Sequence, residues 1–257
     1  MTSWDPTQYL KFTDLRRRPA IDLLVQIPLE SPRLVYDLGC GAGNVTRLLA
    51  ERWPSAKVVG IDSSAEMLTK AREGKGGEKI RWEQVDMSTW SPDEPADVIY
   101  SNAALQWLPD HAGLVPRLVE GLVSGGALAV QMPRMTEAPT HRVQEEAAAA
   151  GPWRDRLVPS PRQLTDNPPS FYYDLLAPRT ARLDIWQTEY LHVLEGANPV
   201  TEWVSGTSLR PYLDLLSDQE QQAFLGEYSS RIDKFYPPRA DGRTLLPFRR
   251  LLMVAIR

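Results

Sequence analysis

The chain has 257 residues, 42% of them hydrophobic, and a formal net charge of −4 at pH 7. This length and composition suit one large α/β domain with a sizeable core, and the charge gives no general attraction for nucleic acid or an anionic membrane surface. A single cysteine excludes an intrachain disulfide, and with only three histidines, far apart in the sequence, we expect no metal centre.

Residues 1–30 are expected to form an arm that leads into a helix. The arm contains Tyr9, Arg16 and Arg18, and Pro19 suits the first turn of the helix that follows. In one interpretation the arm is solvated and packs its aromatic side chains on the domain. In the other it is a lid whose arginines bind carboxylates through forked, bidentate hydrogen bonds.

A glycine-rich turn follows the first predicted strand. Leu34–Leu38 is an apolar run typical of a strand buried on both faces, and helical spacing begins at Asn44. Between them lie Gly39, Gly41 and Gly43, where glycine permits positive φ and a close approach of a ligand. The N–H groups of the helix start favour an anionic or polar ligand. The sequence therefore predicts a small-molecule site at the carboxyl end of a parallel strand.

The spacing of these glycines differs from the dinucleotide-binding pattern G-x-G-x-x-G, because Asn44 replaces its third glycine and Gly43 stands one residue earlier. Asp37 precedes the turn, and its carboxylate would repel a pyrophosphate but could bind a cation, directly or through water. The stretch D-L-G-C-G-A-G-N resembles the first motif of class I S-adenosylmethionine-dependent methyltransferases, whose cofactor carries an ammonium and a sulfonium. The resemblance assigns Asp37, Gly39, Gly41 and Asn44 to the cofactor site. A structural glycine turn and a nicotinamide site are the alternatives.

Lys57–Asp62 is the second predicted strand. Asp62 ends it roughly 20 residues after the glycines, where an acidic residue accepts a ribose hydroxyl in nucleoside-binding α/β folds. A role for Asp62 as helix N-cap is the weaker alternative, because Ser63 and Ser64 can cap that helix. Met67 lies one turn into the helix, where it either packs in the core or covers the nucleoside. We include Ser63 and Met67 in the predicted cofactor site.

Residues 80–85 alternate as a third strand, and Asp86 and Met87 follow it. A carboxylate at this strand end can accept a hydrogen bond from the adenine amino group, while the next backbone N–H donates to the ring. An exposed loop aspartate is the alternative interpretation of Asp86.

Residues 96–100 form the fourth predicted strand, and polar residues at its carboxyl end face the crevice of such a sheet. Asn102 is therefore a candidate near the cofactor, and Trp107 is a candidate for a substrate wall. Residues 110–122 predict a helix, and residues 127–131 predict the fifth strand.

Strands that alternate with helices predict an α/β fold with a parallel sheet covered on both faces. The class I methyltransferase family implies a Rossmann-like, seven-stranded, mostly parallel sheet whose last strand is antiparallel, within a single domain of residues 1–257. Its expected parts are a cofactor-binding core (31–133), helical cap insertions around the sixth strand (134–178 and 198–246) and closing strands (179–197 and 247–257). We expect the insertions to pack together as a cap over the crevice.

Further strings extend the resemblance to methyltransferases of this class that act on small acids. They are WDPTQYLKF near the start, NAALQWLPDH after the fourth strand, LAVQMP at the fifth strand, GTSLRPYL in the cap and LPFRRLLMVAIR at the end. The resemblance implies methyl esterification of a carboxylate of a small polycarboxylic acid, with trans-aconitate the expected substrate and S-adenosylhomocysteine the second product. A carboxylate is ionised at neutral pH, so an in-line displacement requires no general base. The alternatives are another small-molecule oxygen or nitrogen nucleophile, or a cofactor-binding module without turnover.

Recognition of the remaining carboxylates requires cations, and the pocket requires aromatic walls. The candidates are Arg16, Arg18, Trp107, Tyr172, Tyr173 and Arg210. Arg210 precedes a proline and is equally compatible with a structural surface role, and Tyr9 is a candidate beside the methyl group.

No apolar run reaches the length of a membrane span, and the first 20 residues lack the apolar core of a signal peptide. From these features we expect a cytoplasmic protein.

Overall fold

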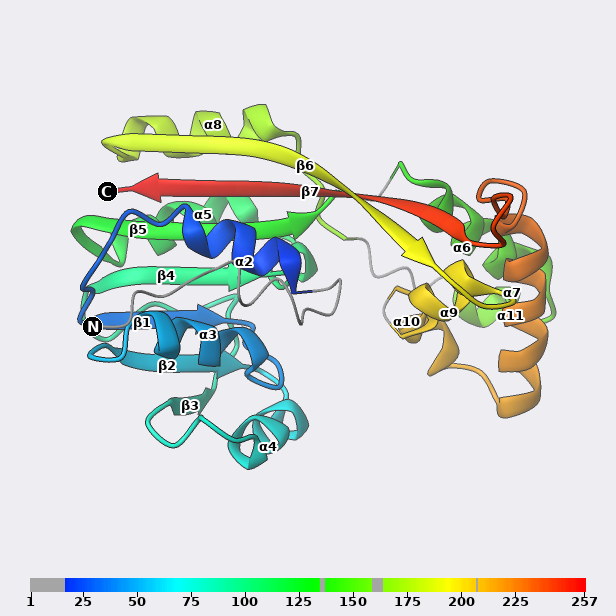
Figure 1. Ribbon diagram of the computed structural model, residues 1–257, viewed down its shortest axis with the longest axis horizontal. Helices are drawn as coiled ribbons and strands as arrows, with labels where there is room; N and C mark the ends of the chain where they lie inside the picture. Colours follow the sequence, from blue (N-terminus) through cyan, green and yellow to red (C-terminus); the bar gives the residue numbers. More distant parts are fainter. Residues whose placement is uncertain (1–16, 135–136, 159–163, 207) are drawn as a thin grey trace. The chain divides into compact units, whose positions relative to one another are not determined.

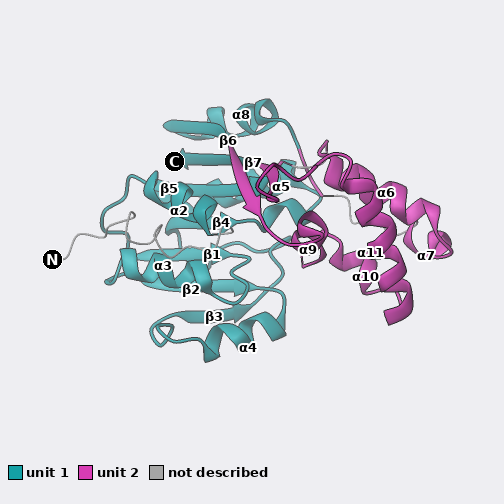
Figure 2. Ribbon diagram, turned by 45° about the vertical axis from the view of Figure 1, so that its right-hand side comes forward, with its two compact units in different colours: residues 1–133, 167–188, 250–257 teal, residues 134–166, 189–249 magenta. Residues whose placement is uncertain are grey.

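The computed structural model describes residues 17–134, 137–158, 164–206 and 208–257. The chain divides into two compact units (Figure 2). Unit 1 takes in Met1–Pro133, Asn167–Thr188 and Arg250–Arg257, and unit 2 takes in Arg134–Asp166 and Glu189–Arg249.

One seven-stranded sheet runs in the order β3-β2-β1-β4-β5-β7-β6 (Figure 1). Its strands are β1 (Leu34–Leu38), β2 (Lys57–Asp62), β3 (Arg81–Gln84), β4 (Ala96–Asn102), β5 (Leu122–Pro133), β6 (Arg182–Leu194) and β7 (Thr244–Ile256). The first five strands pair in parallel, and β7 pairs antiparallel with β5. The predicted mostly parallel, seven-stranded sheet is therefore confirmed.

Helices cover both faces of the sheet in unit 1. They are α2 (Arg18–Val25), α3 (Asn44–Arg52), α4 (Ala65–Glu73), η1 (Leu105–Trp107), α5 (His111–Glu120), α8 (Pro169–Leu176) and η2 (Ala177–Arg179). One apolar cluster joins α2 and α3 to one face, and a second joins α5 and α8 to the opposite face. This arrangement explains why the central strands read as continuous apolar runs, because parallel strands are buried on both sides.

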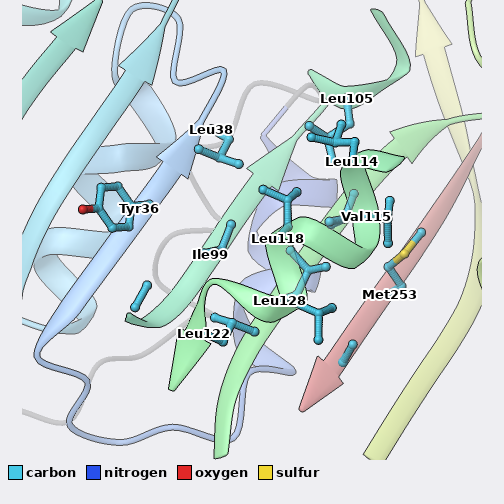
Figure 3. Close-up of a cluster of buried hydrophobic side chains, with 14 of the residues drawn as sticks. Tyr36, Leu38, Ile99, Leu105, Leu114, Val115, Leu118, Leu122, Leu128 and Met253 are labelled. Atoms are coloured by element: carbon cyan, nitrogen blue, oxygen red, sulfur yellow. The ribbon is translucent and has the colours of Figure 1, made fainter. Parts of the chain in front are cut away.

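Alternation along β4 shows how the two faces are built. Val98 and Tyr100 pack toward α2 and α3, whereas Ile99 between them packs toward α5. In Figure 3, Leu118 of α5 lies next to Ile99, and Leu114 lies next to Leu105. The Tyr100 hydroxyl donates a hydrogen bond to the Ala20 carbonyl (2.8 Å), which ties α2 to the sheet.

Unit 2 has its own apolar core. Its helices are α6 (Pro139–Ala150), α7 (Arg154–Leu157), α9 (Pro199–Ser205), α10 (Arg210–Leu213) and α11 (Asp218–Ile232), and the first part of β7 and the last part of β6 also belong to it. Phe224 and Tyr228 of α11 are fully buried there. Ser217 and Glu220 form a capping box that begins α11, so two N-terminal N–H groups of this helix are satisfied.

The compact units divide the chain differently from the expected single domain with cap insertions at 134–178 and 198–246. The sequence places residues up to 178 in the cap, but helix α8 falls in unit 1. The physical reason is that Tyr172 and Leu176, one helical turn apart, are buried in the core shared with α5. The boundary between the second cap insertion and the last strand differs by three residues, because β7 begins at Thr244 and not at residue 247.

Among the described residues, the helices are all too short or too polar to cross a membrane.

Candidate functional site

The glycine turn after β1 is held against the end of β2. Gly39, Gly41 and Gly43 all have positive φ, of 72°, 54° and 75°. The Gly39 N–H donates to the Ile61 carbonyl (2.8 Å), and the Gly41 N–H donates to Asp62 Oδ2 (2.9 Å). Positive φ costs an L-residue with a side chain roughly 1–2 kcal/mol, so the turn favours glycine at all three positions.

The three glycines have different surroundings. A Cβ atom at Gly39 would overlap the Ala104 side chain, and one at Gly43 would overlap Trp82. A Cβ atom at Gly41 would meet no described atom within 4 Å. Gly39 and Gly43 therefore allow close packing inside the protein, whereas Gly41 presents backbone to open space that a ligand can occupy.

Asp37 lies beneath this turn and is almost completely buried. Its Oδ2 accepts a hydrogen bond from the Thr46 hydroxyl (2.6 Å). The pKa of the Asp37 carboxyl is raised to about 7, mainly because the group is buried. The hydrogen bond from Thr46 lowers this pKa, and the nearby negative charge of Asp62 raises it. The carboxyl predicted to face a cation is therefore half protonated near neutral pH.

Asp62 is oriented by two backbone donors. Its Oδ2 accepts from the Gly41 N–H, and its Oδ1 accepts from the Ser64 N–H (2.8 Å). Ser64 caps α4, because its side chain accepts a hydrogen bond from the Met67 N–H, and Asp62 is therefore not the N-cap of this helix. Ser63 and Met67 are exposed at the same strand end. The Asp62 carboxylate is thus fixed beside the open face of Gly41.

The end of β3 contributes Asp86 and Met87. Asp86 is exposed, and its Oδ1 accepts from the Ser88 N–H (2.9 Å), which lowers the pKa of the carboxyl. Met87 packs against the core, and its methyl group would be 3.4 Å from a Cβ atom at Gly39. Both residues lie at the carboxyl edge of the sheet, as predicted.

The end of β4 carries an unsatisfied polar atom. Asn102 Oδ1 is buried and has no hydrogen-bond partner among the described residues. The preceding Ser101 donates to the Leu38 carbonyl (2.9 Å), which links the ends of β4 and β1. Ala103 follows with φ of 53°, the one positive φ of a non-glycine residue among those described. Asn44, at the start of α3, is exposed near the same edge, and no side chain caps that helix.

Tyr172 is not a pocket wall. Its side chain is fully buried, and its hydroxyl is 2.6 Å from His111 Nδ1. The other ring nitrogen, Nε2, lies 2.9 Å from the Leu105 carbonyl, which can only accept, so Nε2 carries the proton and the Tyr172 hydroxyl donates to Nδ1. The prediction for Tyr172 is corrected, while Trp107 and Tyr173 are exposed and stay candidates.

The arginine candidates lie on exposed surfaces. Arg18 Nε lies 3.9 Å from Asp22, and Arg210 Nε lies 2.8 Å from Asp214, each one helical turn away. Arg16 and Tyr9 lie outside the described residues.

The fold also buries three polar residues at or near the carboxyl edge that no sequence motif marks as site residues. They are Gln106, Gln131 and Arg250. Gln106 Oε1 and both amide atoms of Gln131 have no hydrogen-bond partner among the residues that the structure describes. No set of three or more potential metal ligands gathers within the described ranges.

The sheet order, the antiparallel pairing of β7 with β5 and the glycine turn define a class I S-adenosylmethionine-dependent methyltransferase fold. The YcgJ protein from Bacillus subtilis has this fold, with a TM-score of 0.62, 16% identity and coverage of 94% of this chain and 98% of that chain. Phosphoethanolamine N-methyltransferase 2 of Haemonchus contortus, solved with phosphomonomethylethanolamine and S-adenosylhomocysteine, has a TM-score of 0.57, 15% identity and coverage of 93% and 52%. At these identities the similarity concerns the fold alone.

Sequence relatives are much more similar. A family described as a methyltransferase domain matches residues 35–126. The trans-aconitate 2-methyltransferase of Azoarcus sp. (strain BH72) is 51% identical over 258 residues, which cover 100% of each chain. That of Rhodopseudomonas palustris (strain BisB18) is 49% identical over 259 residues, again covering 100% of each. The chain therefore belongs to the trans-aconitate 2-methyltransferase family, and the expected resemblance to class I methyltransferases is confirmed.

Proposed function

We propose that the chain transfers a methyl group from S-adenosylmethionine to a carboxylate of trans-aconitate. The products are a monomethyl ester and S-adenosylhomocysteine. The observation that carries this proposal is the full-length similarity to relatives named for this reaction, together with an intact glycine turn that is open at Gly41.

The residues at the carboxyl edge fit the cofactor. Asp62 and Asp86 present carboxylate oxygens that can accept from the ribose hydroxyls and the adenine amino group, and Gly41 leaves space for the backbone to approach. The buried Asn102 Oδ1 requires a donor, which a bound ligand can supply. When bound, the cofactor supplies an activated methyl group on a sulfonium.

On this proposal, the site residues position the reactants and transfer no proton. Both ring nitrogens of His111 are engaged in the core, so this histidine is not free to act as a base on a substrate. Burial raises the pKa of the Cys40 thiol, so the thiolate nucleophile is disfavoured. A substrate carboxylate needs no base because it is ionised at neutral pH. Rate acceleration is then expected from alignment of the reacting atoms and exclusion of water.

Substrate contacts by Trp107, Tyr173, Arg18 and Arg210 stay part of this proposal, as does a cytoplasmic location. For the two arginines, the proposal requires that the guanidinium leave its neighbouring carboxylate or bind the acid beside it.

The test is methyl transfer from labelled S-adenosylmethionine to a panel of di- and tricarboxylic acids, read by mass spectrometry. We expect a monomethyl ester of trans-aconitate in preference to cis-aconitate, citrate and isocitrate. Tight cofactor binding without transfer to any acid would reject the substrate and leave the cofactor site intact.

A further inference from the structure

The carboxyl edge of β4 and β5 carries a row of polar residues on one face of the sheet. Asn102 and Gln131 are partners in the parallel register of β4 and β5. Pro133 of β5 is the partner of Arg250 in the antiparallel ladder with β7. Because side chains alternate between faces, Gln131, two residues before Pro133, shares a face with Arg250. Such diagonal neighbours lie about 7–8 Å apart, within reach of two long side chains.

Gln131 has a buried side-chain amide without a hydrogen-bond partner among the described residues, as expected of a group that binds a ligand. Its side chain is 1% exposed, yet neither amide atom has a partner among the described residues. A buried amide without a partner costs about 1–3 kcal/mol, so a folded protein rarely keeps one without a use. The amide nitrogen offers two donors, which suit an oxygen anion.

Arg250 places a positive charge in the same row. The residue is 8% exposed, although it belongs to a strand whose other residues on this face, Leu252 and Val254, pack in the core. The planar fork of a guanidinium can bind a carboxylate through two hydrogen bonds. The chain as a whole has a net charge of −4, so an anionic ligand requires a local positive group of this kind.

We propose that Gln131 and Arg250 form a carboxylate-binding subsite for the acid substrate. This inference rests on the proposed function, because it assigns the same reaction its recognition residues. In this subsite the Arg250 guanidinium holds a carboxylate that does not react, and the Gln131 amide donates to it. Asn102, next in the row, separates the subsite from the cofactor turn. Arg250 suits this role better than Arg18 or Arg210, because Arg250 is buried at the carboxyl edge of the sheet, whereas the other two side chains are exposed on helices.

The first variants are Gln131→Leu and Arg250→Gln, with Arg249→Gln as matched control. Arg249 is the neighbouring residue on the same strand, but it is exposed and its Nε bonds Glu189 Oε2 at 2.8 Å. The measurements are the KM for trans-aconitate, the Kd for S-adenosylmethionine and the melting temperature of the ligand-free protein.

We expect Gln131→Leu to raise KM about tenfold and Arg250→Gln to raise it about tenfold to a hundredfold, with the cofactor Kd within about twofold of wild type. Arg250→Lys, which keeps the charge and loses the fork, should have an intermediate KM. Arg249→Gln should leave KM unchanged.

The melting temperature separates substrate binding from a structural role. Removal of an unpartnered buried amide should leave the melting temperature of Gln131→Leu unchanged or raise it, while KM rises. A lower melting temperature with an unchanged KM would identify Gln131 as a structural residue and overturn the proposal.

A binding measurement distinguishes failure of the subsite from failure of the proposed reaction. Calorimetry of propane-1,2,3-tricarboxylate binding to the complex with S-adenosylhomocysteine requires no turnover. If the wild type methylates no acid but binds this tricarboxylate, and Arg250→Gln abolishes the binding, the subsite stands and the reaction is wrong. If trans-aconitate is methylated while KM is unchanged in both variants, the reaction stands and the subsite is wrong. A wild type that binds no tricarboxylate would also reject the subsite.

Discussion

Gly41 and Gly39 share a positive φ but differ in what surrounds them, and this difference separates ligand binding from folding. Gly41→Ala should cost about 1–2 kcal/mol of stability from the backbone alone and should weaken S-adenosylmethionine binding at least about tenfold, because the methyl group enters the open face of the turn. Gly39→Ala adds an overlap with Ala104 and should cost about 2–5 kcal/mol. Urea unfolding and titration calorimetry measure the two effects. An unchanged cofactor Kd in folded Gly41→Ala would remove this backbone from the site.

Asp37 makes the stability of the fold depend on pH in a direction unusual for a carboxyl group. The unfolded chain releases this proton near pH 3.8 and the folded chain releases it near pH 7, because burial disfavours the charge. Between these values the folded state binds more protons, so stability falls as pH rises from about 4 to about 7 and is then constant. At about 1.4 kcal/mol for each pKa unit, the full change is at most about 4 kcal/mol.

Asp37→Asn keeps an acceptor for Thr46 and removes the titration. The free energy of unfolding of this variant, from urea titrations between pH 4.5 and 8, should show a flatter pH dependence than that of the wild type. Parallel curves for the two proteins would mean that Asp37 does not titrate in this range.

At the scale of elements, Tyr172 joins α8 to the start of α5 and to η1 through His111. Tyr172→Phe leaves His111 Nδ1 buried without a donor, so the variant should lose about 1–3 kcal/mol of stability. Its KM for trans-aconitate should stay within about twofold of wild type, because the ring lies in the core and not in a pocket. Chemical denaturation and steady-state kinetics provide the two values. A raised KM at unchanged stability would restore Tyr172 as a substrate contact.

The prediction of elements succeeded where side-chain periodicity and turn chemistry agree. The strands β1 and β2 and the glycine turn match their predicted bounds, and the polar strand ends Asp62, Asp86 and Asn102 lie at one edge of the sheet. The burial of Tyr172 is predictable from helical spacing, because Leu176 one turn later lies on the same buried stripe of α8, whereas Tyr173 is exposed.

Gln131 and Arg250 could not be selected from the sequence for physical reasons. Gln131 lies within an apolar run and resembles an ordinary strand residue until its amide is seen to lack a partner. Arg249 and Arg250 are adjacent on one strand, so their side chains point to opposite faces of the sheet. The sequence alone does not show which of the two faces the core. Only the ladder with β5 assigns Arg250 to the buried face near Gln131.

At the scale of the whole molecule, the chain has separate apolar cores in its two units. Phe224 is fully buried in unit 2, and Phe224→Ala should destabilise that unit by about 3–5 kcal/mol. Hydrogen exchange should then increase in α6 and α11, while the Kd for S-adenosylmethionine, whose proposed site lies in unit 1, changes by less than about threefold. Loss of exchange protection throughout β1, β2 and β4 in this variant would mean that the two cores unfold as one.

The sequence predicts the second unit only as helical insertions. Proline-rich turns and helical periodicity predicted its helices, but the sequence does not state which apolar faces pack together. The β6 and β7 strands illustrate the difficulty, because each is one continuous strand whose residues belong partly to one unit and partly to the other.

The hydrogen bond from the Gly41 N–H to Asp62 gives the chain a spectroscopic reporter of its own site. A glycine amide that donates to a carboxylate resonates downfield in a region of the nitrogen–proton spectrum where few signals overlap. Its chemical shift depends on the hydrogen bond to the Asp62 carboxylate. A nucleoside hydroxyl that donates to the same carboxylate would therefore shift the Gly41 resonance. Occupancy of the site can thus be followed in real time without a label on the ligand.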